Sequence, residues 1–258
     1  MWSPIIGCSK VSPACEHCVD RAWDSRAVRP WMLRYRSAVV GSGGEWNGEV
    51  SFIPERLTEP LQQRQRSVFN VGTASDFFHE NVTEEWRAKM LEIMLLADHH
   101  HYVIPTRRID AALAWLDGLS ELPPMTLAAS VENQDVADVV VPKLVQAESV
   151  RKRVDCSPLM GAVDLELWAD DIDWVEVSGL YDGGTFHIED PSWVPPIARM
   201  CQDHQIPMLF RGWGSDFKQR LTPELILAST GRSMPASAVP ATAVNRVNGE
   251  YFSFWPGF

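Results

Sequence analysis

The chain has 258 residues, 45% of them hydrophobic, and a formal net charge of −11 at pH 7. This length and apolar content suffice for one large core, and the acidic balance argues against a protein that coats nucleic acid by neutralising phosphates. The sequence has no apolar run of 18 or more residues and no signal-peptide pattern, so we expect a cytoplasmic protein with no membrane partner.

The first feature along the chain is a cysteine-rich loop at residues 7–18, Gly-Cys-Ser-Lys-Val-Ser-Pro-Ala-Cys-Glu-His-Cys. It holds Cys8, Cys15 and Cys18, which are three of the five cysteines of the chain. In a reducing compartment, clustered thiols are more often metal ligands than disulfide partners. Three thiolates can ligate three irons of a 4Fe-4S cluster and leave the fourth iron open to a small molecule.

After the cysteine loop, a helix is expected over residues 20–35, followed by a glycine-rich break over 40–47. Short apolar runs then alternate with amphipathic stretches of helical length. Thr83 in front of two glutamates and Asp190 in front of a proline are typical helix starts. The expected strands are 67–72, 101–105, 126–131, 153–156, 174–178 and 207–210, and the expected helices are 83–97, 109–119, 134–147 and 193–205.

A series of strands and helices in alternation predicts an α/β fold with parallel strands. About six such units form either an open doubly wound sheet or a barrel, and the chain length favours a full or partial (βα) barrel. We therefore expect a barrel over residues 1–214, with the cysteine loop at its N-terminal end. Residues 215–258 have no clear period and are expected to form a C-terminal extension packed on the barrel.

Polar side chains follow the expected strands, at the edge where barrel enzymes place their sites. Arginines suit a carboxylate, and acids suit ribose hydroxyls or an ammonium group, so this edge suits a zwitterionic ligand such as S-adenosyl-L-methionine. No catalytic residue is assigned. The predicted cofactor-binding residues are Ser75, Asp76, Arg107, Glu132, Ser157, Ser178 and Arg211.

Four segments carry a resemblance to a known family: residues 7–18, 70–80, 130–133 and 155–159. In this order, over about residues 1–214, the chain resembles an uncharacterised phage and bacterial family of the phage gene-product thirty-seven/sixty-eight type. That family looks like a branch of the radical S-adenosylmethionine superfamily, whose members have a full or partial barrel with a three-cysteine loop after the first strand.

The resemblance implies that Cys8, Cys15 and Cys18 hold a 4Fe-4S cluster that cleaves S-adenosyl-L-methionine reductively and starts radical chemistry. It further implies a reductase or a flavodoxin-like protein as electron donor. The phage association of the family implies a small-molecule or nucleic-acid-derived substrate: a modified nucleobase, a nucleotide or a nucleic acid.

Two other interpretations remain open. The first is a non-catalytic interaction module stabilised by zinc, in which His17, His79 or Cys156 completes the site, because zinc prefers four nitrogen or sulfur ligands. The second is an inactive relative. It is suggested by Val19 and Asp20, where the family has an aromatic residue and alanine, and by residues 178–180, where it has a Gly-Gly-Glu turn.

Overall fold

The protein is described by a computed structural model, in which the chain divides into two compact units that are described separately below. The N-terminal unit comprises Met1–Ala129 and Ala147–Arg151, and the C-terminal unit comprises Ser130–Gln146 and Lys152–Phe258. The structure describes residues 1–18, 30–42, 44–182, 185–211, 245–247 and 250–252.

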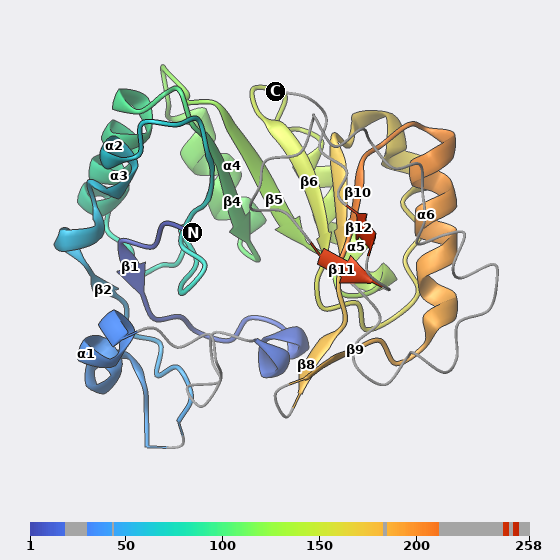
Figure 1. Ribbon diagram of the computed structural model, residues 1–258, viewed down its shortest axis with the longest axis horizontal. Coiled ribbons are helices and arrows are strands. Elements are labelled where there is room, and N and C mark those ends of the chain that lie inside the picture. The colour runs from blue at the N-terminus through green and yellow to red at the C-terminus, as the bar shows by residue number, and fades with distance from the viewer. Residues whose placement is uncertain (19–29, 43, 183–184, 212–244, 248–249, 253–258) are drawn as a thin grey trace. The chain divides into compact units, whose positions relative to one another are not determined.

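The N-terminal unit is built on parallel strands joined by helices. Strand β3 (Val68–Asn70) pairs with β4 (His101–Thr106), which pairs with β5 (Met125–Ser130). Figure 1 shows β4 and β5 side by side. Helix α3 (Glu84–Leu96) joins β3 to β4, and α4 (Ile109–Asp117) joins β4 to β5.

The start of α3 follows from its sequence. The Thr83 hydroxyl caps the helix by accepting a 3.2 Å hydrogen bond from the Trp86 amide, and Glu84 and Glu85 lie in the first turn, where the helix dipole favours acids. Met90, Ile93 and Met94 form the buried side of α3.

The N-terminal segment runs along β3. Trp2 forms an isolated parallel bridge with Val71, and its amide donates to the Asn70 carbonyl at 2.9 Å. The chain then enters β1 (Ile5–Ile6), which pairs antiparallel with β2 (Ser51–Phe52). Short helical segments complete the unit: η1 (Pro13–His17), α1 (Pro30–Val39), η3 (Pro54–Arg56) and α2 (Glu59–Gln62).

The C-terminal unit has its own parallel strands. Strand β6 (Arg151–Cys156) pairs with β7 (Trp174–Val177), and β7 pairs with β10 (Met208–Phe210). The other elements of this unit are α5 (Gln134–Leu144), η4 (Glu166–Asp171), η5 (Pro191–Trp193), α6 (Val194–Asp203), the hairpin of β8 (Leu180–Asp182) and β9 (Thr185–His187), and the pair β11 (Asn245–Val247) and β12 (Glu250–Phe252).

The parallel strands form one sheet in the order β10-β7-β6-β5-β4-β3. All of its described pairings are parallel, and β3 and β10 are its two ends. The α/β class and the partial (βα) barrel with parallel strands are therefore confirmed, and the predicted strands and helices match those of the sheet within a few residues.

The predicted elements also differ from the structure in places. The helix expected over 20–35 falls partly outside the described residues, and its described part, α1, continues to Val39 instead of ending at residue 35. Most of the expected C-terminal extension lies outside the described residues as well. Within the described parts of the chain, no helix is long and apolar enough to cross a membrane.

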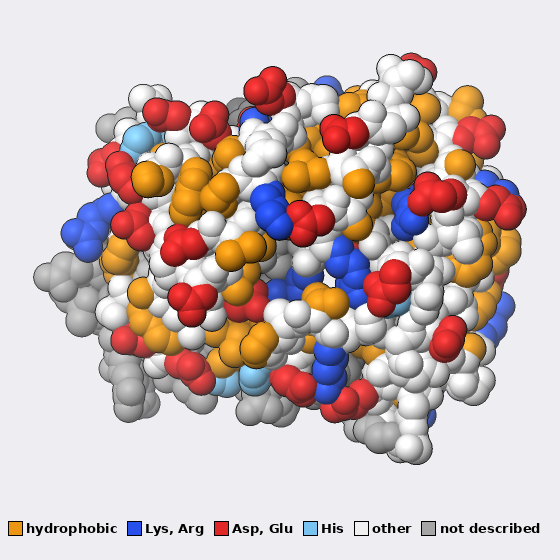
Figure 2. All heavy atoms as spheres, turned by 180° about the vertical axis from the view of Figure 1, so that it is seen from behind, with side chains coloured by type: hydrophobic (Ala, Val, Ile, Leu, Met, Phe, Trp, Pro, Cys, Tyr) orange, Lys and Arg blue, Asp and Glu red, His pale blue; other side chains and the backbone are white. Residues whose placement is uncertain are grey.

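Charged side chains are spread over the face of the molecule that Figure 2 shows. On the face in Figure 2, acidic side chains stand among basic and hydrophobic ones and do not gather into one patch. On this face the acidic side chains are therefore distributed rather than focused.

Candidate functional site

Gly7 sets the direction in which the cysteine loop leaves β1. Its φ is +106°, and a Cβ at this position would lie 2.1 Å from the Glu49 carbonyl oxygen, so only glycine fits. The Gly7 amide donates to the Ala74 carbonyl at 3.0 Å, and its own carbonyl accepts from the Ser75 hydroxyl at 2.6 Å. The residue immediately before Cys8 is thus fixed to the segment that follows β3.

The three thiols of the loop are half-buried, and none of them forms a disulfide. The Cys8 sulfur lies 4.0 Å from Nη1 of Arg108, and the Cys15 sulfur lies 3.9 Å from the Ser12 hydroxyl. Cys15 lies within η1, and the Cys18 amide closes that turn on the Cys15 carbonyl at 3.3 Å. All three thiols therefore belong to one short segment of the N-terminal unit.

The surroundings of Cys8 are electrostatically mixed. Burial raises the pKa of its thiol to about 12, and the Asp76 carboxylate adds to the rise, whereas the Arg108 guanidinium opposes it. Cys18 is near enough to contribute to the same shift. Among the residues that the structure describes, however, no three His, Cys, Asp or Glu side chains stand close enough to hold a metal ion together.

Asp76 is the centre of a buried hydrogen-bond network beside the loop, and its side chain is 7% exposed. Its carboxylate accepts from the Phe78 amide at 2.9 Å, from the Thr106 hydroxyl at 2.9 Å and from the Arg107 amide at 3.1 Å. It also forms an ion pair of 3.1 Å with Arg108. Both carboxylate oxygens are thus used by protein donors, which ties the ends of β3 and β4 together.

Ser9, the neighbour of Cys8, has a fully used hydroxyl group. The Asn81 amide donates to Nδ1 of His79, so this imidazole carries its proton on Nε2 and donates it to Ser9 Oγ at 2.9 Å. Arg108 Nη2 is a second donor at 2.7 Å, and the hydroxyl itself donates to Glu80 at 3.2 Å. Because both nitrogens of His79 are in use, His79 is not available as a zinc ligand in this arrangement.

Ser75 and Arg107, two further predicted residues, also lie at the cysteine loop. Ser75 bonds the Gly7 carbonyl, and Arg107 Nη1 donates to the Ser12 hydroxyl at 3.2 Å. The structure therefore brings together Ser75, Asp76 and Arg107 with the three cysteines in the N-terminal unit.

The C-terminal unit contains the other predicted residues, each of which follows a strand of the parallel sheet. Ser157 and Ser178 follow β6 and β7, and their hydroxyls are 2.7 Å apart. Glu132 follows β5 with 1% exposure, and its carbonyl accepts from the Met160 amide at 2.7 Å. Arg211 follows β10, and its amide donates to the Val177 carbonyl at 3.0 Å.

Arg211 belongs to a largely buried ionic cluster. It pairs with Glu176, which is bridged by Arg153 at 3.2 Å, and Arg153 also pairs with Asp155. The Arg153 guanidinium lies over the Trp174 ring, 4.8 Å from its centre. Burial raises the pKa of Asp155, and Arg153 opposes this rise. The cluster balances two positive and two negative side chains, so Arg211 is held in place but is also partly neutralised.

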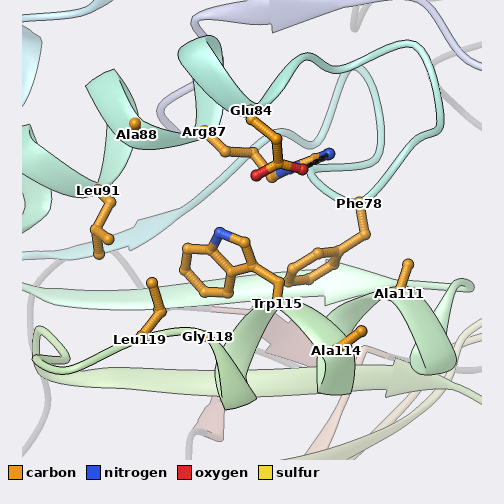
Figure 3. Close-up of a pocket in the computed structure, with 10 residues that line it drawn as sticks. All are labelled: Phe78, Glu84, Arg87, Ala88, Leu91, Ala111, Ala114, Trp115, Gly118 and Leu119. Atoms are coloured by element: carbon orange, nitrogen blue, oxygen red, sulfur yellow. Dashed lines mark hydrogen bonds and ion pairs between the residues drawn. The ribbon is translucent and has the colours of Figure 1, made fainter.

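A pocket of about 540 Å³ lies elsewhere in the N-terminal unit, between α3 and α4. Figure 3 shows the rings of Trp115 and Phe78 on one side of the pocket and the Glu84–Arg87 ion pair on the other. None of the predicted site residues lines it. The lining residues are Phe78, Glu84, Arg87, Ala88, Leu91, Ala111, Ala114, Trp115, Gly118 and Leu119.

Sequence reasoning missed several polar neighbours of the cysteines: Ser9, Ser12, Glu80 and Arg108. Arg108 is the most consequential, because it contacts Asp76, Glu80 and Ser9 and lies beside Cys8. The Arg-Arg pair after β4 was visible in the sequence, but no periodicity beyond the strand end shows which arginine faces the loop.

The comparisons with known proteins give a family without an activity. No curated protein and no solved structure is significantly similar to the chain. One family model, described as a protein of unknown function (DUF5131), matches residues 1–248 and so extends beyond the region predicted as the barrel. With nearly the whole sequence matched, the chain belongs to the DUF5131 family.

Proposed function

We propose that the protein is a radical S-adenosylmethionine enzyme whose 4Fe-4S cluster is held by Cys8, Cys15 and Cys18. One observation carries the proposal: three partly exposed thiols on one short loop directly after β1, in a parallel α/β fold of the partial-barrel kind. Three cysteine ligands leave one iron of such a cluster open to a further ligand.

The donor set fits an iron–sulfur cluster in its chemistry, since thiolates are the usual ligands and no other side chain is required. Among the described residues no three His, Cys, Asp or Glu side chains stand close enough to hold a single metal ion, but the three cysteines of a 4Fe-4S cluster ligate three different irons and need not converge on one point. Zinc is the competing occupant. The use of both His79 nitrogens by Asn81 and Ser9 weighs against a zinc site completed by that histidine.

The residues of this chain would then bind and orient the cofactor. Arg107, next to Ser12 of the loop, is suited to pair with the carboxylate of S-adenosyl-L-methionine. Ser157, Ser178, Glu132 and Arg211 remain predicted contacts from the C-terminal unit, while Ser75 and Asp76 act through the backbone and Arg108. When bound and reduced, such a cluster supplies one electron that cleaves the sulfonium into methionine and a deoxyadenosyl radical.

Anaerobic reconstitution tests the ligands. We expect about four irons and four sulfides per chain, and a loss of most of this content in Cys8→Ser, Cys15→Ser and Cys18→Ser. Cys201→Ala is the matched control, because Cys201 is buried in α6 of the other unit and should keep the wild-type iron content. Stoichiometric zinc without labile sulfide would instead support the zinc-stabilised interaction module.

Product analysis tests the activity and the substrate class. The reduced protein should convert S-adenosyl-L-methionine into deoxyadenosine and methionine, with dithionite in place of the reductase or flavodoxin-like donor. Adding candidate nucleobases, nucleotides or DNA should increase this cleavage and give a modified product. A loaded cluster without any cleavage would favour the inactive relative.

A further inference from the structure

We propose that Arg108 is a positioning residue that clamps the Cys8–Ser9 segment and places a fixed positive charge beside the Cys8 sulfur. The inference rests on the proposed function for its redox consequence but not for the clamp itself. Four contacts of one guanidinium carry it: Asp76 at 3.1 Å, Glu80 at 3.1 Å, Ser9 at 2.7 Å and the Cys8 sulfur at 4.0 Å.

The guanidinium is held in place by the carboxylate of Asp76, which follows β3. Asp76 is itself fixed by the Thr106 hydroxyl and by the Phe78 and Arg107 amides, so its carboxylate has little freedom to follow a moving arginine. The Arg108 side chain is only 11% exposed. A planar guanidinium with donors in fixed directions can satisfy several acceptors at once, which an ammonium group cannot do in the same geometry.

On the side of the cysteine loop, the guanidinium holds Ser9. Ser9 Oγ accepts hydrogen bonds from Arg108 and His79 and donates one to Glu80. Every donor and acceptor position of this hydroxyl is therefore used. Ser9 follows Cys8 directly, and Gly7 before it is tied to Ala74 and Ser75. Cys8 is therefore fixed on both sides, whereas Cys15 and Cys18 lie in a turn further along the loop.

The charge has its own consequence. A largely buried cation near a ligand sulfur stabilises the more negative, reduced state of a cluster, because net charge and contacts to the sulfurs set the reduction potential. Arg108 should therefore make a cluster bound through Cys8 easier to reduce. Geometry and charge are separable, since lysine keeps the charge and loses the fork of donors.

Three variants and one control separate these two roles in the full-length protein. Arg108→Gln removes both the clamp and the charge, and Arg108→Lys removes mainly the clamp. Ser9→Ala keeps the charge of Arg108 and removes the hydroxyl that Arg108, His79 and Glu80 contact. Arg56→Gln is the control, because Arg56 is a partly buried arginine of the same unit that pairs with Glu59.

The first measurement is hydrogen exchange of residues 7–18 in protein without a cluster. We expect exchange about tenfold faster than wild type in all three variants and unchanged exchange in the control, because each variant removes a charge-assisted hydrogen bond at Ser9. Wild-type exchange in Arg108→Gln and Ser9→Ala would overturn the clamp, whether or not the protein binds iron.

The second measurement is the midpoint potential of the reconstituted cluster. We expect a more negative potential in Arg108→Gln, and a potential near wild type in Arg108→Lys, Ser9→Ala and the control. An unchanged potential in Arg108→Gln would overturn the electrostatic role. If no variant and no wild-type protein takes up a cluster, the proposed function fails, and the exchange measurement still decides the clamp.

Discussion

Replacing Asp76 with alanine should destabilise the N-terminal unit strongly. The change leaves the largely buried Arg108 without its buried carboxylate partner, and removing one member of a buried ion pair typically costs about 3–5 kcal/mol. It also leaves the Thr106 hydroxyl and two backbone amides without their acceptor, at about 1 kcal/mol or more each. Because Arg108 keeps its contacts to Glu80 and Ser9, we expect a total cost of about 3–5 kcal/mol rather than the full sum.

The assay is equilibrium unfolding in urea together with the thermal midpoint. A loss of this size lowers the midpoint of a chain of this length by roughly 6–20 °C. Asp117→Ala is the matched control, because Asp117 is an exposed aspartate at the end of α4 and should change stability by less than about 0.5 kcal/mol. A cost below about 1 kcal/mol for Asp76→Ala would refute the assignment of this network as the joint between β3, β4 and the cysteine loop.

Three further predictions concern single positions. Gly7→Ala should cost at least about 2 kcal/mol more than Gly44→Ala in urea unfolding, because both have positive φ but only the Cβ at Gly7 would clash, at 2.1 Å from Glu49 O; equal costs would contradict this. Burial lowers the pKa of His101 in the folded protein to about 4, whereas its pKa in the unfolded chain is near 6.5. As the pH falls, the unfolded chain therefore binds this proton first, and the folded state loses stability from pH 6.5 downward. Between pH 7.5 and pH 5 the free energy of unfolding of His101→Gln should therefore fall by about 2 kcal/mol less than that of the wild type. Parallel pH profiles of the free energy of unfolding would show that His101 does not titrate in this way. Thr83→Ala should cost about 1 kcal/mol by removing the cap of α3, with Thr83→Ser retaining most of the stability, and an equal loss in both variants would argue against the cap.

Much of the fold follows from hydrophobic periodicity. Strand β4 is a buried run and α3 begins at a threonine cap with two acids, so both are readable without tertiary information. The pair of β1 and β2 could not be predicted, because each strand has two residues and their partners are far apart in the chain. The hairpin of β8 and β9 was missed for the same reason of length.

The candidate site was predictable only in part. Ser75, Asp76 and Arg107 follow strands and lie near the cysteine loop, and Ser157 lies beside Ser178. Their place at the strand ends follows from the fold, and their role in binding stays a prediction. Which side chain faces the loop depends on the turn after each strand and not on any period. That is why the sequence selects Arg107, whereas the structure places its neighbour at Cys8.

The most direct test of the proposed function is the electron paramagnetic resonance spectrum of the anaerobically reconstituted, dithionite-reduced protein, recorded with and without S-adenosyl-L-methionine. The proposed function predicts the signal of a reduced 4Fe-4S cluster that depends on Cys8, Cys15 and Cys18 and changes when S-adenosyl-L-methionine is added. A protein without such a signal, or with a signal that saturating S-adenosyl-L-methionine leaves unchanged, would contradict it.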